Sequence, residues 1–296
     1  MVWVGIGGLF VGILLRRTRG TNSLPGEIFA VLAAACLRLE YICASAAVAR
    51  SWGDKASEYW IETSPDTAKW ILPSASGDVN ATIHTTFNPM ALVVSSSCVC
   101  LLLCGVNESK RATHFFTSLK VTLVLFMIVI ALYYAQLSNW QPWAPYGVAG
   151  IARGATSTFF GYLGYDQVCC LAGEAIDAKR NLPRAILGVL SACAALYVLA
   201  TLALTGMMQY DQISTVAGFP DAFRDRGAVV VAQVAALGEI ITMPIVILVT
   251  VMVQPRLFYA LAMDGLLPNI FKVQTVDGNL IWSLVIAGGL FIVVSA

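Results

Sequence analysis

Apolar runs close to the length of a membrane crossing recur along the whole chain. Of its 296 residues, 58% are hydrophobic and 12% are charged, and the mean hydropathy is +0.77. A transmembrane helix needs about 20 consecutive apolar residues, and soluble domains do not carry so many such runs. The sequence therefore predicts an all-α, polytopic membrane helix bundle with seven crossings, at residues 27–49, 89–107, 114–137, 154–174, 184–208, 228–254 and 279–296.

The N-terminal stretch differs from these crossings. Residues 2–15 are apolar but short, and the basic sequence RRTRG follows at 16–20. Such a stretch is compatible with a signal-like segment or with a partial helix. We therefore divide the chain into an N-terminal segment, 1–25, and a transmembrane domain, 26–296.

The basic residues predict the orientation of the bundle, because cytoplasmic loops carry an excess of Lys and Arg near helix ends. The clusters at 16–20, 108–114 and 177–184 fall on one side of the predicted membrane, together with Arg256 and Lys272. The opposite, outer side receives the loop that contains Asn80 in the sequon NAT, which predicts glycosylation there.

Glycines interrupt the crossing predicted at 154–174, in the sequence FFGYLGYD. In lipid a broken helix persists only where it packs in protein or lines a cavity, because its freed backbone groups need partners. Transporters use such breaks at midplane substrate sites. The glycines permit the break, and the aromatic residues beside them are suited to closing around a solute. The alternative is that the glycines only let another helix approach closely.

Five ionisable residues fall within the apolar segments: Arg38, Glu40, Lys120, Asp166 and Glu239. Each is costly in lipid and usually faces a partner or a wet cavity. For Glu40 and Glu239, a polar contact between helices is the alternative to a ligand role, and Lys120 has the alternative of snorkelling to the interface. Pro244, five residues after Glu239, frees a backbone carbonyl near it.

Several functional classes lack support in the sequence. It contains no Walker loop, no zinc-type Cys and His spacing and no nucleophile elbow. The net charge of +1 gives no bulk field for nucleic acid. We therefore expect no enzyme activity, no cofactor, no bound metal and no nucleic-acid partner.

Three blocks carry a family resemblance: residues 26–52, 158–186 and 254–268, which read GEIFAVLAAACLRLEYICASAAVARSW, TFFGYLGYDQVCCLAGEAIDAKRNLPRAI and QPRLFYALAMDGLLP. On these blocks the chain resembles the amino acid, polyamine and organocation (APC) transporter superfamily, and within it the cationic amino acid transporter branch. The resemblance covers roughly residues 26–270 and corresponds to family helices three to nine. It implies a partial LeuT-like fold that is truncated at both ends.

The resemblance also implies roles for individual residues. The break corresponds to the family's sixth helix, whose free carbonyls receive the substrate's α-amino group, so the expected binding residues are Phe160, Gly161, Tyr162, Leu163 and Gly164. To these we add Glu239, whose carboxylate is placed to meet a cationic side chain. Glu40, Lys120 and Asp166 are the expected coupling or gating residues. Glu40 is a possible proton carrier, and Lys120 matches a lysine thought to replace a sodium ion.

These observations lead to one expected function and several alternatives. The expectation is secondary-active or facilitative transport of amino acids, most of all arginine, lysine and ornithine, in a plasma membrane or a vacuolar or lysosomal membrane. One alternative is a carrier of neutral amino acids or polyamines. Another is a truncated, non-transporting relative that binds and regulates. A seven-helix receptor is disfavoured, because positive-inside counting puts the entry to the first crossing in the cytoplasm.

Overall fold

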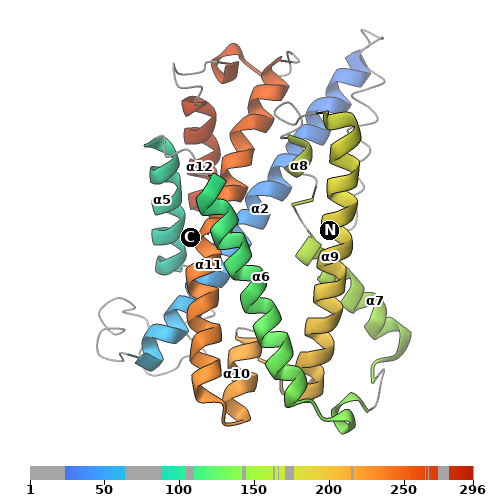
Figure 1. Cartoon of the computed structure of the whole chain (residues 1–296). Helices are drawn as coiled ribbons and strands as arrows, with labels where there is room; N and C mark the ends of the chain where they lie inside the picture. The colour runs from blue at the N-terminus through green and yellow to red at the C-terminus, as the bar shows by residue number, and fades with distance from the viewer. Residues whose placement is uncertain are drawn as a thin grey trace.

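The described part of the chain is a bundle of α-helices with short 3-10 turns in some of its connections (Figure 1). In this computed structural model the described residues are 24–63, 88–104, 110–141, 145–162, 164–165, 167–170, 177–214, 217–263, 265, 267–272 and 280–295. No strand occurs among them. The elements are α2 (Leu24–Thr63), α5 (Pro89–Leu103), α6 (Lys110–Tyr133), η1 (Leu137–Trp140), α7 (Gly147–Thr158), η2 (Phe159–Tyr162), α8 (Gln167–Cys170), α9 (Ala178–Met207), α10 (Gly218–Asp225), α11 (Val229–Met263), η4 (Asn269–Lys272) and α12 (Ile281–Ser295).

The predicted all-α membrane bundle is confirmed, and the protein is a multi-pass integral membrane protein. Among the described residues, four helices are long and apolar enough to cross a membrane, at Leu32–Trp60, His114–Tyr133, Ala178–Met207 and Val229–Met263. The crossings predicted at 89–107 and 279–296 correspond to α5 and α12, which have 15 residues each. At 1.5 Å per residue each is shorter than the roughly 30 Å hydrocarbon core.

The crossing predicted at 154–174 is not one continuous helix. The α-helix α7 ends at Thr158, the 3-10 turn η2 follows, and α8 begins only at Gln167. Gly164, between η2 and α8, has a φ of +107°, a conformation that side chains with a Cβ rarely adopt. The glycines therefore mark a true interruption of the helix, as the sequence predicted.

The helix α11 lies at the centre of the packing. One buried cluster joins it to α2, α5 and α12 and contains Ile247, Val251 and Phe291. A second cluster joins it to α6, α9 and α10 and contains Ala235 and Phe223. Since α11 contributes to both clusters, it connects the two halves of the bundle.

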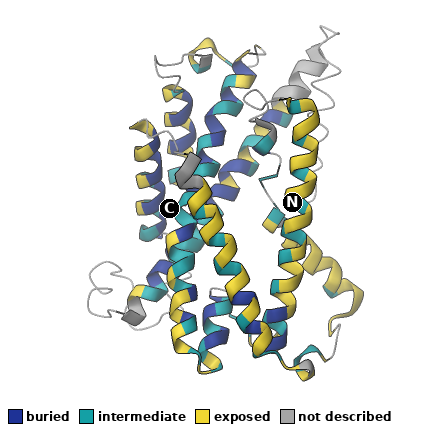
Figure 2. Cartoon of the chain, in the orientation of Figure 1, coloured by how far each residue is buried: buried dark blue, intermediate teal, exposed yellow. Residues whose placement is uncertain are grey.

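Many apolar side chains lie on the outside of the bundle, above all along α9 (Figure 2). Leu187 and Val198 on α9 are 66% and 58% exposed, and Val129 on α6 is 67% exposed. Lipid tails, unlike water, solvate such surfaces without cost. The starts of α6 and α9 point toward the same end of the bundle as η4, and all three carry basic residues (Figure 1). This arrangement agrees with the predicted orientation.

The contact between α2 and α5 is unusually close at Gly53. Asn88 caps the start of α5 by accepting a hydrogen bond from the Ala91 N–H at 3.1 Å, and its amide donates to Asp54 at 2.7 Å. A Cβ added at Gly53 would lie 2.7 Å from the Asn88 Oδ1 and 2.9 Å from the Ala91 nitrogen. Only glycine fits here without disturbing the cap.

We predict that Gly53→Ala lowers the free energy of unfolding by about 1–3 kcal/mol, because the added methyl group displaces this cap. Gly188→Ala is the matched control, since Gly188 lies inside α9 with nothing within 4 Å of an added Cβ. That control should be neutral or slightly stabilising. Thermal unfolding of the purified protein in detergent measures both, and equal stability of the two variants would contradict the prediction.

Candidate functional site

Helices α2 and α11 are joined by polar contacts along their length. The Lys55 ammonium pairs with the Glu239 carboxylate, and the Trp52 indole N–H donates to the Ile240 carbonyl at 2.9 Å. Further along, the Gln254 amide donates to the Ser45 hydroxyl at 3.2 Å. Finally, the Arg38 guanidinium lies 4.0 Å from the centre of the Phe258 ring. Residue numbers fall on α2 as they rise on α11, so the two helices are antiparallel. We call these four contacts the α2–α11 seam.

Trp52 donates a hydrogen bond to a backbone carbonyl of α11 that has no donor within its own helix. Proline has no N–H, so Pro244 leaves the carbonyl of Ile240, four residues earlier, without its helical hydrogen bond. The Trp52 indole supplies the missing donor from the neighbouring helix. The freed carbonyl that the sequence predicted near Glu239 is therefore used to bind α2.

Lys120 joins the charged part of the seam. Its ammonium group, on α6, interacts electrostatically with both Glu239 and Lys55. The close approach of α6 and α11 makes this possible, since a Cβ at Gly238 would lie only 2.5 Å from a methyl group of Leu123. Lys55 and Glu239 retain 19% and 20% side-chain exposure. The Glu239 carboxylate thus pairs with one ammonium group and interacts electrostatically with a second.

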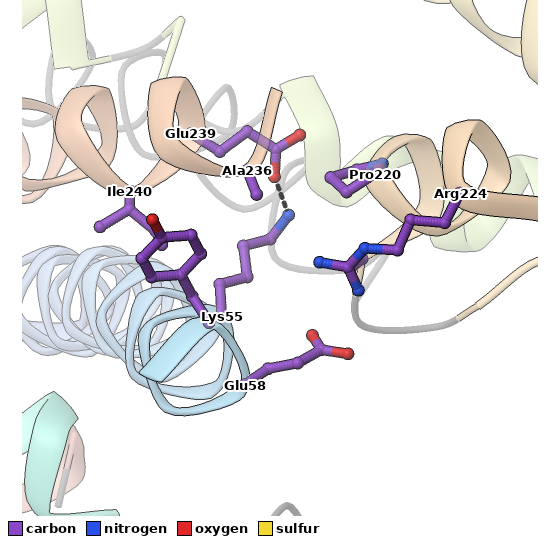
Figure 3. Close-up of a pocket in the computed structure, with 9 residues that line it drawn as sticks. Lys55, Glu58, Pro220, Arg224, Ala236, Glu239 and Ile240 are labelled. Atoms are coloured by element: carbon purple, nitrogen blue, oxygen red, sulfur yellow. Dashed lines mark hydrogen bonds and ion pairs between the residues drawn. The ribbon is translucent and has the colours of Figure 1, made fainter. Parts of the chain in front are cut away.

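A pocket opens beside the Lys55–Glu239 pair (Figure 3). It has about 310 Å³ of empty volume, including the part that is continuous with the outside. Its lining residues come from α2, α11, α10 and the position just before α10: Lys55, Glu58, Tyr59, Ala217, Pro220, Arg224, Ala236, Glu239 and Ile240. In Figure 3 Arg224 extends from α10 toward Lys55 and Glu58. Charges of both signs therefore surround a small space with apolar walls.

The interrupted helix has its own polar contact with α9. The Tyr197 hydroxyl donates to the Gly161 carbonyl at 2.7 Å, and the Tyr197 and Tyr162 rings meet edge to face with centroids 5.2 Å apart. The Gln167 N–H donates to the Gly164 carbonyl at 3.2 Å. A carbonyl oxygen has two lone pairs, so it can accept from a second donor beside Tyr197.

The structure brings only some of the predicted site residues together. Lys120 and Glu239 share the charged part of the seam, whereas Gly161, Tyr162 and Gly164 lie on the stretch between α7 and α8. Glu40 is half-buried on α2. The other predicted residues lie outside the described residues: Leu163, Asp166, Asn80 and the side chain of Phe160. Among the residues that the structure does describe, no three His, Cys, Asp or Glu side chains gather as a metal site would require.

Sequence reasoning missed three participants: Lys55, Trp52 and Tyr197. It ended the first crossing at residue 49, because charged residues follow, but α2 continues to Thr63. The spacing of Ser45, Trp52 and Lys55 at seven and three residues was the available signal, since such spacings share a helix face. Nothing local to Tyr197 indicated that it reaches the interrupted helix.

We predict that Trp52→Phe lowers the free energy of unfolding by about 1–3 kcal/mol, because the Ile240 carbonyl loses its donor in an apolar setting. Pro244→Ala restores the helical N–H for that carbonyl. In the Pro244→Ala background Trp52→Phe should therefore lower the free energy of unfolding much less. A double-mutant cycle of thermal unfolding measures the difference. The same cost in both backgrounds would contradict this role of Trp52.

Comparison with known proteins gives a family match. The family model described as amino acid permease matches residues 28–296. The chain is 32% identical over 246 residues to the methylthioribose transporter of Bacillus subtilis, covering 83% of this chain and 52% of that protein. It is 33% identical over 248 residues to the cationic amino acid transporter 9, chloroplastic, of Arabidopsis thaliana, covering 83% and 43%. It is also 32% identical over 251 residues to the branched-chain amino acid permease BcaP of Bacillus subtilis, covering 84% and 53%.

These matches confirm the resemblance that the three sequence blocks indicated. The chain spans about half the length of these relatives. The matched family is one of permeases and not of enzymes.

Proposed function

Because the chain belongs to the amino acid permease family, we propose that it carries amino acids across a membrane, by secondary-active or facilitative transport. The observation that carries this proposal is the interruption between α7 and α8, within an otherwise continuous apolar bundle. Interrupted helices supply backbone groups to a substrate at membrane depth, where lipid offers no other partner.

The interrupted stretch offers the chemistry that an α-ammonium group needs. We assign the ammonium group to the second lone pair of the Gly161 carbonyl, beside the hydrogen bond from Tyr197. Tyr162, packed on the Tyr197 ring, forms one wall. By the family resemblance Phe160 and Leu163 complete the binding stretch with Gly164.

For the substrate class, we propose cationic amino acids, of the arginine and lysine type. Support comes from the resemblance to the cationic branch and from the cationic amino acid transporters among the relatives. The branched-chain permease and the methylthioribose transporter among the relatives make neutral amino acids the class to test against it. The presence of Glu239 does not by itself favour cationic over neutral substrates. A guanidinium group would have to displace Lys55 before it could bind this carboxylate.

The coupling roles proposed for Glu40, Lys120 and Asp166 follow from the same resemblance. Lys120 has the best structural support of the three, since its charge acts on both members of the Lys55–Glu239 pair. A change in the charge of Lys120 would therefore alter the strength of the Lys55–Glu239 ion pair in the α2–α11 seam. The proposed location is a plasma membrane or a vacuolar or lysosomal membrane.

We predict that Gly164→Ala reduces amino acid uptake into vesicles by about tenfold or more, because a φ of +107° strains any residue with a Cβ and the interruption shifts. Gly154→Ala is the matched control, on α7, with nothing within 4 Å of an added Cβ. Uptake of radiolabelled arginine and leucine into vesicles that contain equal amounts of each variant measures both. Equal uptake by Gly164→Ala and Gly154→Ala would show that transport does not depend on the conformation of the interrupted helix.

For substrate class, we predict that arginine competes with radiolabelled lysine at least about tenfold better than leucine does, a difference of about 1.4 kcal/mol in binding. The measurement is inhibition of lysine uptake over a range of competitor concentrations. Equal inhibition by arginine and leucine would contradict the proposed cationic specificity and indicate a broad carrier of neutral and cationic amino acids.

A further inference from the structure

The pocket in Figure 3 carries four ionisable side chains of alternating sign: Lys55, Glu58, Arg224 and Glu239. They come from three different helices, so the arrangement depends on the fold and not on one charged run. Lys55 and Glu239 are bonded to each other, and Arg224 Nη1 also lies 3.4 Å from the Asp221 carboxylate. The remaining walls are largely apolar, formed by Pro220, Ala236 and Ile240 among others.

The position of the pocket suits entry from one side of the membrane. It lies between the end of α2, the start of α11 and α10, at the end of the bundle opposite the basic helix starts (Figure 1). The exposure of about one fifth that both partners of the ion pair retain leaves them within reach of a solute. Because the pocket is continuous with the outside, the body of a solute can stay outside it while a small charged group reaches the ion pair.

The charges of Lys55 and Glu239 determine which kind of ligand can separate the two side chains. An amine that binds Glu239 takes from Lys55 its direct partner, and a carboxylic acid that binds Lys55 leaves Glu239 with only the electrostatic interaction of Lys120. Losing the direct partner of a partly buried ion pair is unfavourable. A zwitterion supplies both opposite charges at once, so it exchanges one ion pair for two and leaves neither side chain uncompensated.

We propose that this pocket is an entry site for the zwitterionic head group of an amino acid, which inserts between Lys55 and Glu239. The Lys55 ammonium donates to the ligand's carboxylate, and the ligand's α-ammonium donates to the Glu239 carboxylate. Lys120, on α6, adds a second positive charge that interacts electrostatically with Glu239. This inference rests on the proposed transport of amino acids and assigns a second site to the same substrate.

The proposal changes the role of Glu239 from the one predicted from the sequence. A carboxylate that binds the α-ammonium group acts on every amino acid alike, whatever its side chain. Selection among arginine, lysine and leucine would then occur elsewhere. The two roles make opposite predictions for Glu239→Gln: parallel losses of arginine and leucine binding if it binds the head group, and a loss confined to arginine if it binds a cationic side chain.

The experiment places a reporter in the pocket itself. Ala236→Cys puts a thiol on the pocket wall, and its labelling by a membrane-impermeant thiol reagent is followed with and without leucine. Two analogues of leucine carry one charge each: isoamylamine lacks the carboxylate, and 4-methylpentanoate lacks the amine. The control reporter is Val229→Cys, at the exposed start of α11 and outside the pocket lining. Labelling is measured on the full chain in vesicles, beside leucine and arginine uptake.

We expect leucine to slow labelling at position 236 and not at 229. Each single-charge analogue should need at least about tenfold higher concentration for the same protection. Protection should weaken by about tenfold or more in Lys55→Met/Glu239→Leu, which replaces the ion pair with apolar residues of similar size, a change that folded proteins tolerate. Lys179→Met, an exposed charge at the opposite end of the bundle, should leave protection unchanged.

Three results would overturn the entry site: equal protection by the single-charge analogues, full protection in the Lys55→Met/Glu239→Leu variant, or no protection at all by leucine. If amino acid uptake by the unaltered protein persists in these cases, the proposed function stands and only the entry site falls. If neither uptake nor protection occurs, both proposals fail. Thermal unfolding of the double variant in detergent shows whether it keeps its fold.

Discussion

The contact between α2 and α11 is the interaction on which the rest of this structure depends. In lipid a charged group or a freed carbonyl has no water to bind, so each must find a partner in the protein. The helix α11 carries two such groups, the Glu239 carboxylate and the Ile240 carbonyl, and α2 supplies a partner to both. Gln254 and Phe258 extend the same contact along α11.

This dependence explains why α11 also organises the apolar packing. Its two faces belong to two different buried clusters, so the α2 side is fixed by polar contacts while the opposite side packs against α6, α9 and α10. Non-directional packing alone would let apolar helices slide against each other. Directional bonds at several depths set the register, and the apolar clusters then fill around it. The close approach at Gly238 brings Lys120 into the same electrostatic unit.

Two features bear on the proposed transport of amino acids. The interrupted helix between α7 and α8 is held on α9 by Tyr197, which binds the Gly161 backbone oxygen. The pocket at the end of α2 holds charges of both signs, one pair of which is already bonded. The α-ammonium group of an amino acid suits both places, and its carboxylate suits the pocket. The chemistry common to all α-amino acids, and not any one side chain, therefore relates the two proposed sites.

The sequence predicted what local physics determines. Apolar length predicted the helices, Gly161 and Gly164 predicted the interruption, and Pro244 predicted a freed carbonyl. It did not predict which donor takes that carbonyl, because the pairing of Trp52 with Ile240 depends on the register between helices that lie far apart in the chain. It also ended α2 too early at residue 49, because a hydropathy window cannot see that Lys55 is neutralised by Glu239. Long-range pairing thus makes polar residues compatible with a membrane helix.

Cross-linking of introduced cysteines would test the α2–α11 register most directly. The eight native cysteines are first replaced by alanine, and a short bifunctional thiol reagent is then applied to selected pairs. The antiparallel seam predicts cross-links for Lys55→Cys with Glu239→Cys and for Arg38→Cys with Phe258→Cys. It predicts none for Arg38→Cys with Glu239→Cys, since positions 38 and 55 are about 25 Å apart along the helix. Efficient cross-linking of the 38/239 pair, with none of the 55/239 and 38/258 pairs, would contradict the α2–α11 seam and the proposed entry site.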